Sequence, residues 1–121
     1  MNLNRHFITG ILCGSLITGG LSFYFRSASA AETAPKVLLE NARVRVRQVQ
    51  FEPGVKRGPH THPYAHVGVI LDAGTLEFIE NGKSERRTFK AGDVGWRDAN
   101  VTHEVVDLGE TPMRVIEVEL K

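Results

Sequence analysis

Hydrophobic and polar residues alternate with a period of two along much of the chain after residue 36. Arginines alternate with valines over residues 43–47, and residues 113–120 alternate between two distinct faces. This period is typical of a β-strand, because successive side chains point to opposite faces. No segment outside the first 30 residues shows a sustained period of 3.6. The pattern therefore predicts an all-β domain.

Turn residues divide this region into short strands. Asn81-Gly82 separates residues 76–80 from residues 85–89 and favours a hairpin, and Ala91-Gly92-Asp93 precedes a strand over residues 94–97. Short strands at roughly ten-residue spacing, with glycine turns between them, predict an antiparallel sandwich or barrel. The remaining predicted strands cover residues 65–71, 103–106 and 113–120.

Charged residues on two of these strands are predicted to face outward. They are Arg43, Arg45 and Arg47 on one strand and Glu117 and Glu119 on the other. If the two strands are neighbours, the opposite charges pair across them. The alternative is two separate solvated faces. Exposed pairs would contribute little to stability, on the order of 0–1 kcal/mol.

The first 30 residues have the pattern of a targeting segment. Arg5 precedes an apolar stretch over residues 7–25, and Ala28-Ser29-Ala30 forms an A-x-A cleavage site. We therefore predict a signal peptide over residues 1–30, a short flexible lead over residues 31–36 and one domain over residues 37–121, located in the periplasm or secreted. The alternative is an uncleaved anchor helix with the domain facing the periplasm, since the stretch reaches the roughly 18 residues of a spanning helix.

Composition and charge exclude some classes of partner. The chain has 15 basic and 14 acidic residues, and Arg5 and Arg26 fall in the predicted signal peptide. The remaining domain is close to neutral, so nothing predicts a nucleic-acid partner. Cys13, the single cysteine, also lies in the predicted signal peptide. The domain is thus expected to depend on packing, or on a metal, and not on a disulfide.

The histidines are concentrated in two places. His60, His62 and His66 fall within seven residues, His103 follows on a later predicted strand, and His6 lies in the leader. Neutral imidazole is the commonest protein ligand for transition metals near neutral pH. The first two histidines share one face if their segment is a strand. The cluster predicts a site for divalent Fe, Mn, Ni, Cu or Zn, with His66 either a ligand or packed beside the site.

The spacing of these residues resembles the two motifs of the cupin superfamily. Gly54, five further residues and His60-Thr61-His62 match the start of the first motif, which closes at Gly74; Gly92, His103 and Asp107 match the second motif. The resemblance extends over most of residues 37–120 and also includes small cupins named for β-alanine degradation. It implies a small jelly-roll barrel with a metal near its mouth. Two histidines and an acid from the first motif and one histidine from the second would hold the metal.

Two departures from the cupin motifs stand out. The acid of the first motif is absent, since the candidate positions hold His66 and Val67, and Asp98-Ala99-Asn100 replaces the Pro-x-Gly turn of the second. The turn change is mild, because Asn tolerates left-handed geometry. The missing acid changes the chemistry. Four neutral imidazoles would leave the charge of the metal undiminished and would favour an anionic ligand.

The sequence thus predicts an exported cupin metalloprotein that acts on a small organic acid. Dioxygenase-, isomerase- and lyase-type chemistry all remain open. The alternative is a non-catalytic module that binds or senses a small molecule or a metal. The resemblance also implies a homodimer formed through sheet edges, and contact with a membrane is expected only if the leader stays uncleaved.

Overall fold

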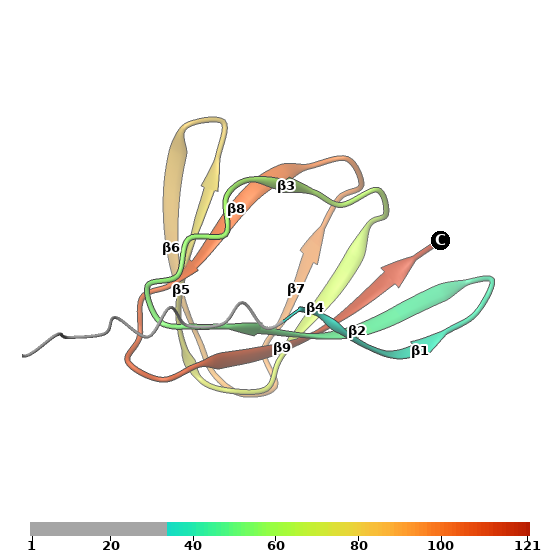
Figure 1. The fold of residues 1–121 in the computed structure, drawn as a ribbon, viewed down its shortest axis with the longest axis horizontal. Coiled ribbons are helices and arrows are strands. Elements are labelled where there is room, and N and C mark those ends of the chain that lie inside the picture. The colour runs from blue at the N-terminus through green and yellow to red at the C-terminus, as the bar shows by residue number, and fades with distance from the viewer. Residues whose placement is uncertain (1–33) are drawn as a thin grey trace, which may run out of the picture.

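The structure of the protein is a computed structural model that describes residues 34–121 (Figure 1). These residues form nine strands and no helix, which confirms the predicted all-β class. The signal peptide or anchor helix predicted over residues 1–30 lies outside the described residues. Within residues 34–121 there is no helix with the length and hydropathy needed to cross a membrane.

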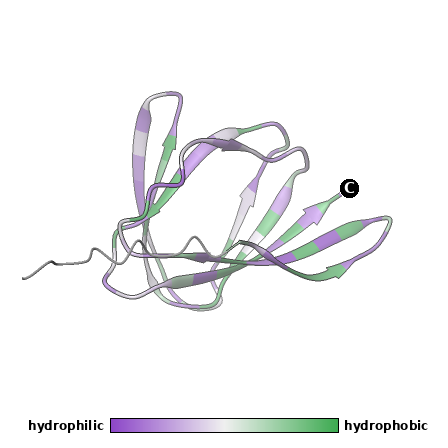
Figure 2. Cartoon of the chain, viewed as in Figure 1, coloured by the Kyte–Doolittle hydropathy of each residue, from purple (hydrophilic) through white to green (hydrophobic). Residues whose placement is uncertain are grey.

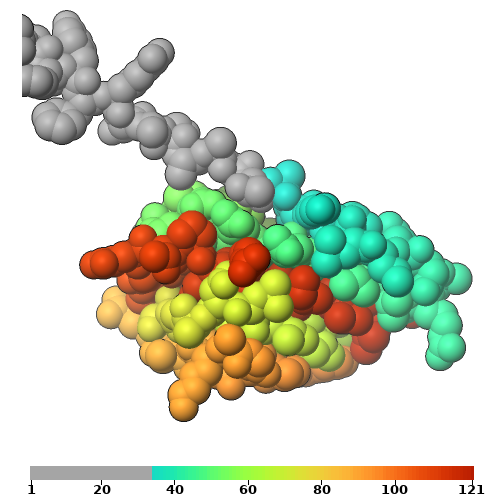
Figure 3. Space-filling view, turned by 90° about the horizontal axis from the view of Figure 1, so that it is seen from below, coloured from blue at the N-terminus to red at the C-terminus, as the bar shows by residue number. Residues whose placement is uncertain are grey.

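The strands form two antiparallel sheets that face each other across one interior (Figure 1). The five-stranded sheet has the order β1 (Lys36–Glu40), β2 (Val44–Phe51), β9 (Met113–Leu120), β4 (His66–Ile70) and β7 (Val94–Arg97). The four-stranded sheet has the order β3 (His60–Thr61), β8 (Thr102–Asp107), β5 (Gly74–Glu80) and β6 (Lys83–Phe89). In the view from below, β1 and β2 cover one end of the outer surface and β7 lies along its margin (Figure 3).

The predicted turns lie where the sequence placed them. Asn81 and Gly82 both have positive φ, 51° and 72°, and connect β5 to β6 in a two-residue hairpin. Two positive φ values match the twist of the flanking strands, which explains the preference for Asn-Gly at this position. Asn100, in the altered turn before β8, has φ 62°, so it does adopt the left-handed geometry that Asn tolerates.

The two strands with alternating charges are neighbours. β2 and β9 pair antiparallel, with Arg45 opposite Glu119 and Arg47 opposite Glu117. The predicted cross-strand ion pairs are confirmed, because Arg45 contacts Glu119 and Arg47 contacts both acids. Hydropathy alternates along both strands (Figure 2). Arg43, before β2, is exposed as expected, whereas Arg45 and Arg47 are half-buried.

The outward orientation predicted for the two acids is wrong. Glu117 and Glu119 are 8% and 0% exposed and lie on the same inward face of β9 as Met113 and Val115. The physical reason is the in-register pairing with β2, which brings arginines to the carboxylates inside the barrel. A buried carboxylate is tolerated only when it is paired and hydrogen-bonded. These ion pairs are therefore part of the interior and not of the surface.

The hydrophobic core fills one end of this interior. Its fully buried members come from four strands and pack against three partly buried phenylalanines, Phe51, Phe78 and Phe89. At the other end the buried side chains are polar. The core residues are Ile70, Leu76, Val105, Met113 and Val115.

Candidate metal centre

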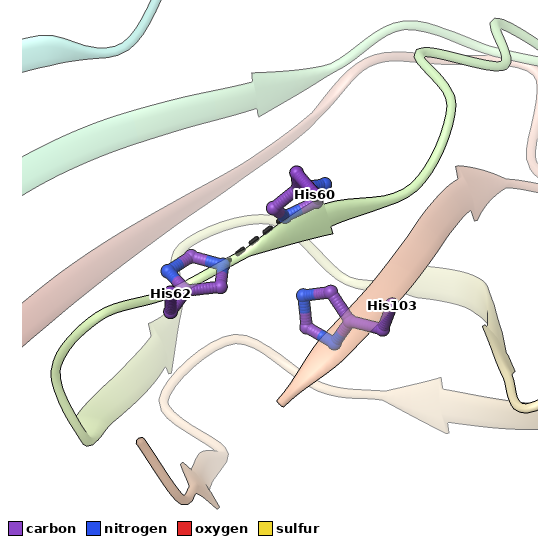
Figure 4. Close-up of side chains that lie close together, drawn as sticks. All are labelled: His60, His62 and His103. Atoms are coloured by element: carbon purple, nitrogen blue, oxygen red, sulfur yellow. Dashed lines mark hydrogen bonds between the residues drawn. The ribbon is translucent and has the colours of Figure 1, made fainter. Parts of the chain in front are cut away.

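Strand pairing brings the histidines of the two motifs together. β3 and β8 pair so that His60 lies directly opposite His103. His62 follows β3 by one residue, and His66 begins β4. Figure 4 shows the rings of His60 and His62, from one segment, approaching the ring of His103 from β8. Residues that are 43 positions apart in the chain thus face one another.

His60, His62 and His103 form a compact group of possible ligands. One nitrogen of each ring lies within 4.8 Å of the others. The Nε2 atoms of His60 and His62 are 3.1 Å apart, and the rings of His60 and His103 are 4.7 Å apart between centroids. Nitrogens bound about 2.0–2.1 Å from one ion lie roughly 3–3.5 Å from each other. The spacing of the His60 and His62 nitrogens therefore fits one ion, and a nitrogen of His103 lies within 4.8 Å of both.

His66 points into the same interior but belongs to a second group. It is 5% exposed, and its ring centroid is 4.3 Å from that of His62. Its ligand atom lies within 4.8 Å of ligand atoms of His62 and Glu117, and not of all three histidines in the first group. His62 is common to both groups. The four predicted ligands are thus brought together as two overlapping sets.

The state of the imidazoles suits metal binding. Burial lowers the pKa of His103 to about 3, with smaller effects from the charges of His60 and Arg97. Burial also lowers the pKa of His62, although Glu117 acts in the opposite direction. Both rings are therefore neutral near pH 7 and keep a lone pair. The Nδ1 atoms of His66 and His103 are buried and have no hydrogen-bond partner within residues 34–121.

Two arginines and two carboxylates lie directly behind the histidines. Arg47 Nη2 is 2.7 Å from Glu117 Oε2 and 2.8 Å from Glu119 Oε1. Burial acts to raise the pKa of Glu119, but the hydrogen bond from Arg45 and the charges of both arginines outweigh it, so the pKa is lowered. Glu119 Oε1 also lies 3.7 Å from His62 Nδ1. A carboxylate in this place can orient the imidazole, as acids behind metal-binding histidines commonly do.

A small cavity opens beside the histidines. Its volume is about 130 Å³, and His60, His66, His103 and Glu117 line its polar side. Phenylalanines, aliphatic side chains and Arg97 also line it. Gly68 also lines the cavity, directly across β4–β9 from Glu117. Because glycine has no side chain, this position adds only backbone to the lining of the cavity.

The sequence interpretation found the histidines but missed the acids. The sequence predicts that Glu117 and Glu119 face outward, either paired with arginines or solvated, since charged residues on an alternating strand usually face outward. A usable signal was present in Val115, which shares the face of both acids. An apolar residue two positions before a pair of acids indicates that the whole face can be interior.

The chain belongs to the cupin family. The Cupin domain family profile matches residues 47–119, which is more than half of the chain. This match confirms the family expected from the two histidine motifs. The fold agrees, since a crystal structure of a cupin domain from Bordetella pertussis Tohama I superposes with a TM-score of 0.67. That structure is 30% identical and covers 72% of this chain and 91% of its own. The predicted small jelly-roll barrel is thereby confirmed.

Two characterised relatives differ in how much they share with this chain. A Pseudomonas aeruginosa protein named Beta-alanine degradation protein BauB is 33% identical over 91 residues, 74% of this chain and 95% of that protein. Oxalate decarboxylase OxdC from Bacillus subtilis is 30% identical over 73 residues. That match covers 58% of this chain and 19% of the longer enzyme. Relatives of this fold thus have different roles.

Proposed function

We propose that this protein is an exported metal-dependent cupin that acts on a small organic acid. His60, His62 and His103 would hold a divalent transition metal, with His66 completing its surroundings. The observation that carries the proposal is the group of three imidazoles with ligand atoms within 4.8 Å of one another. Imidazole donors suit Fe, Mn, Ni, Cu or Zn better than Ca or Mg, which prefer oxygen.

The walls of the cavity support a small anionic substrate. A bound divalent ion would supply Lewis acidity toward a carboxylate or enolate oxygen. Arg97 lines the cavity, with its guanidinium 4.6 Å from the ring centroid of Phe78, and it can pair with a carboxylate. The cavity of about 130 Å³ limits the size of the ligand. A space of about 150 Å³ accommodates benzene, so we expect a ligand of roughly six non-hydrogen atoms.

The relatives support the same substrate class. The name of the Pseudomonas aeruginosa relative refers to β-alanine, and that of the Bacillus subtilis relative refers to oxalate. Both compounds are small carboxylic acids. The match covers 95% of the first relative but only 19% of the second. We therefore carry over the substrate class and not a particular reaction.

Metal analysis tests this proposal. We expect the purified protein to contain about one equivalent of a transition metal, and His60→Ala with His62→Ala to remove it. Losing two of three ligands should weaken binding by well over 100-fold, since even outer partners of ligands are worth about 10–100-fold. Thr61→Ala is the matched control, because Thr61 lies between the two histidines and bonds Thr102 instead. A metal-free wild type, or unchanged metal content in the double variant, would contradict the proposal.

A second candidate is a module that binds a small molecule without converting it. The imidazole of His66 in place of the acid of the first motif favours this candidate, since it removes the usual anionic ligand. Incubating the metal-loaded protein with a panel of small acids separates the two. Product formation or oxygen uptake supports an enzyme. A ligand that raises the melting temperature and is recovered unchanged supports a binding module.

Export and dimer formation remain proposals of the same kind. Cleavage after Ala30 would make Ala31 the first residue, which the mass of protein isolated from its native compartment would reveal. The edge strands β1 and β7 expose apolar side chains, including Leu39 at 49% and Trp96 at 55%, which supports pairing of two copies. Sedimentation analysis over a range of concentrations would find only monomers if that pairing does not occur.

A further inference from the structure

We propose a second metal position in this pocket, formed by His62 after β3, His66 on β4 and Glu117 on β9. Two imidazoles and one carboxylate would take a divalent cation such as Fe(II), Mn(II) or Zn(II). This position rests on the proposed function, since it shares His62 with the three-histidine group. It adds a carboxylate ligand for the metal to the proposed function, and this ligand comes from a strand outside the first motif.

The geometry of the three side chains carries the assignment. Their ligand atoms lie within 4.8 Å of one another, and all three residues are buried, at 5%, 5% and 8% exposure. The Nδ1 atom of His66 is buried without a hydrogen-bond partner in the described part of the chain. Leaving a buried polar atom unpaired costs about 1–3 kcal/mol. A metal bound through Nδ1 at this position would satisfy that nitrogen.

The register of the sheet explains why a carboxylate reaches this point. β4 and β9 pair with Gly68 opposite Glu117, and both residues line the cavity. Arg47 donates to Oε2 of Glu117 at 2.7 Å. The other carboxylate oxygen, Oε1, is not the atom that accepts from Arg47 and can bind an ion. Arg47 thus fixes the direction of the carboxylate, as hydrogen-bonding partners of metal ligands generally do.

The two positions differ in their chemistry. The three-histidine group offers neutral donors only, whereas Glu117 adds a negative charge close to the ion. Imidazole-rich sites suit Cu, Ni and Zn, while carboxylates also suit Mn, and two histidines with one carboxylate are the donor set of non-haem Fe(II) sites. His66 and Glu117 both line the cavity, so the open coordination positions would face the same ligand space.

Cobalt(II) binding to a background variant tests this position. His60→Gln with His103→Gln removes two ligands of the first group and leaves His62, His66 and Glu117. We expect this variant to retain about one equivalent of Co(II), measured by visible absorption and by metal content after gel filtration. Adding Glu117→Gln should weaken binding by at least about 100-fold, as expected for a direct ligand. Adding Glu104→Gln is the matched control and should leave Co(II) affinity unchanged, since Glu104 bonds the Gly58 amide outside both groups.

The outcomes separate this inference from the function on which it rests. A wild type that binds no Co(II) overturns both. If the wild type binds Co(II) and the His60→Gln, His103→Gln variant does not, the second position alone is overturned. The same holds if adding Glu117→Gln to that variant leaves its Co(II) affinity unchanged. Adding His66→Gln to the His60→Gln, His103→Gln variant is a second test of this position. It leaves the ion pair between Arg47 and Glu117 intact. It should cause a similar loss, and retained affinity there also overturns the second position.

Discussion

The two ends of the barrel interior share strands β4, β8 and β9 but differ in chemistry. Along the inward face of β9, Met113 and Val115 belong to the apolar core, and Glu117 and Glu119 follow at the next two inward positions. All four residues are less than 9% exposed. A single strand therefore passes from a hydrophobic environment to a charged one without leaving the interior.

This difference separates the source of stability from the candidate site of chemistry. Burial of apolar surface stabilises the fold by roughly 25 cal/mol per Å², which favours the end around Met113. At the other end, burial of carboxylates and imidazoles is unfavourable, and the two arginines offset part of that cost. A buried ion network is weak evidence for stability. Glu119 Oε1 lies 3.7 Å from His62 Nδ1, so the network is in a position to orient that imidazole.

The largest effect on folding is expected at the apolar end. Met113 is 1% exposed, and a Cβ at the neighbouring Gly74 would lie 2.8 Å from Met113 Cγ, so the site is tightly packed. We expect Met113→Ala to lower the free energy of unfolding by about 2–5 kcal/mol, because it leaves a cavity. Urea denaturation of the apoprotein measures this. Leu120→Ala, on the outer face of β9 at 43% exposure, is the control and should change stability much less.

At the charged end, a single arginine is expected to matter nearly as much. Arg47 contacts both buried acids, and its side chain is 18% exposed. Arg47→Ala leaves two carboxylates with less compensation, and breaking a buried pair in this way costs about 3–5 kcal/mol. We expect the lower end of that range, because Arg45 still contacts Glu119. The same denaturation measurement applies.

Two further variants sharpen this contrast between the ends. Arg86→Ala removes an exposed arginine that contacts Glu77, and it should change stability little. Arg47→Met combined with Glu117→Met removes both charges of one pair, and it should cost less than Arg47→Ala alone. Equal, small effects of Arg47→Ala and Arg86→Ala would mean that the charged end is effectively solvated, and the division of the interior would not hold.

The fold could be predicted from the sequence because the local turn signals agreed with the strand pattern along the whole chain. Asn81-Gly82 fixed one hairpin, and the predicted strand over residues 94–97 matches β7. The pairing of distant strands was not accessible in the same way. No local sequence signal indicates that β9 lies between β2 and β4. This arrangement decides which face of β9 is inside.

The candidate site was accessible only in part for the same reason. His60, His62 and His103 could be found because two motifs place them by short-range spacing. The inward direction of His66 depends on where β4 begins, so the sequence left open whether His66 is a ligand. Glu117 lies 51 residues after His66 in the chain, and no spacing rule connects them. Their proximity depends on the β4–β9 register, which only the three-dimensional structure supplies.

The smallest expected effect is the pH dependence that the charged end gives to the apoprotein. Burial lowers the pKa of His103 to about 3 and also lowers that of His62, whereas an unfolded chain returns both toward 6.5. Between about pH 7.5 and 5.5 the unfolded state therefore takes up protons that the folded state does not. The free energy of unfolding should fall as the pH is lowered through this window, at most about 1.4 kcal/mol per pH unit for each imidazole.

Urea denaturation in the presence of a chelator, at intervals between pH 7.5 and 5.5, measures this slope. The carboxylates with lowered pKa values, such as Asp72 at about 2, have unfolded values near 4 and contribute mainly below this window. His103→Gln removes the largest shift and should make the slope shallower, while Met113→Ala should lower stability by the same amount at every pH. A flat profile in the wild type, or the same slope in His103→Gln, would show that the histidine end is open to water. The distinction between the two ends would then rest on packing alone.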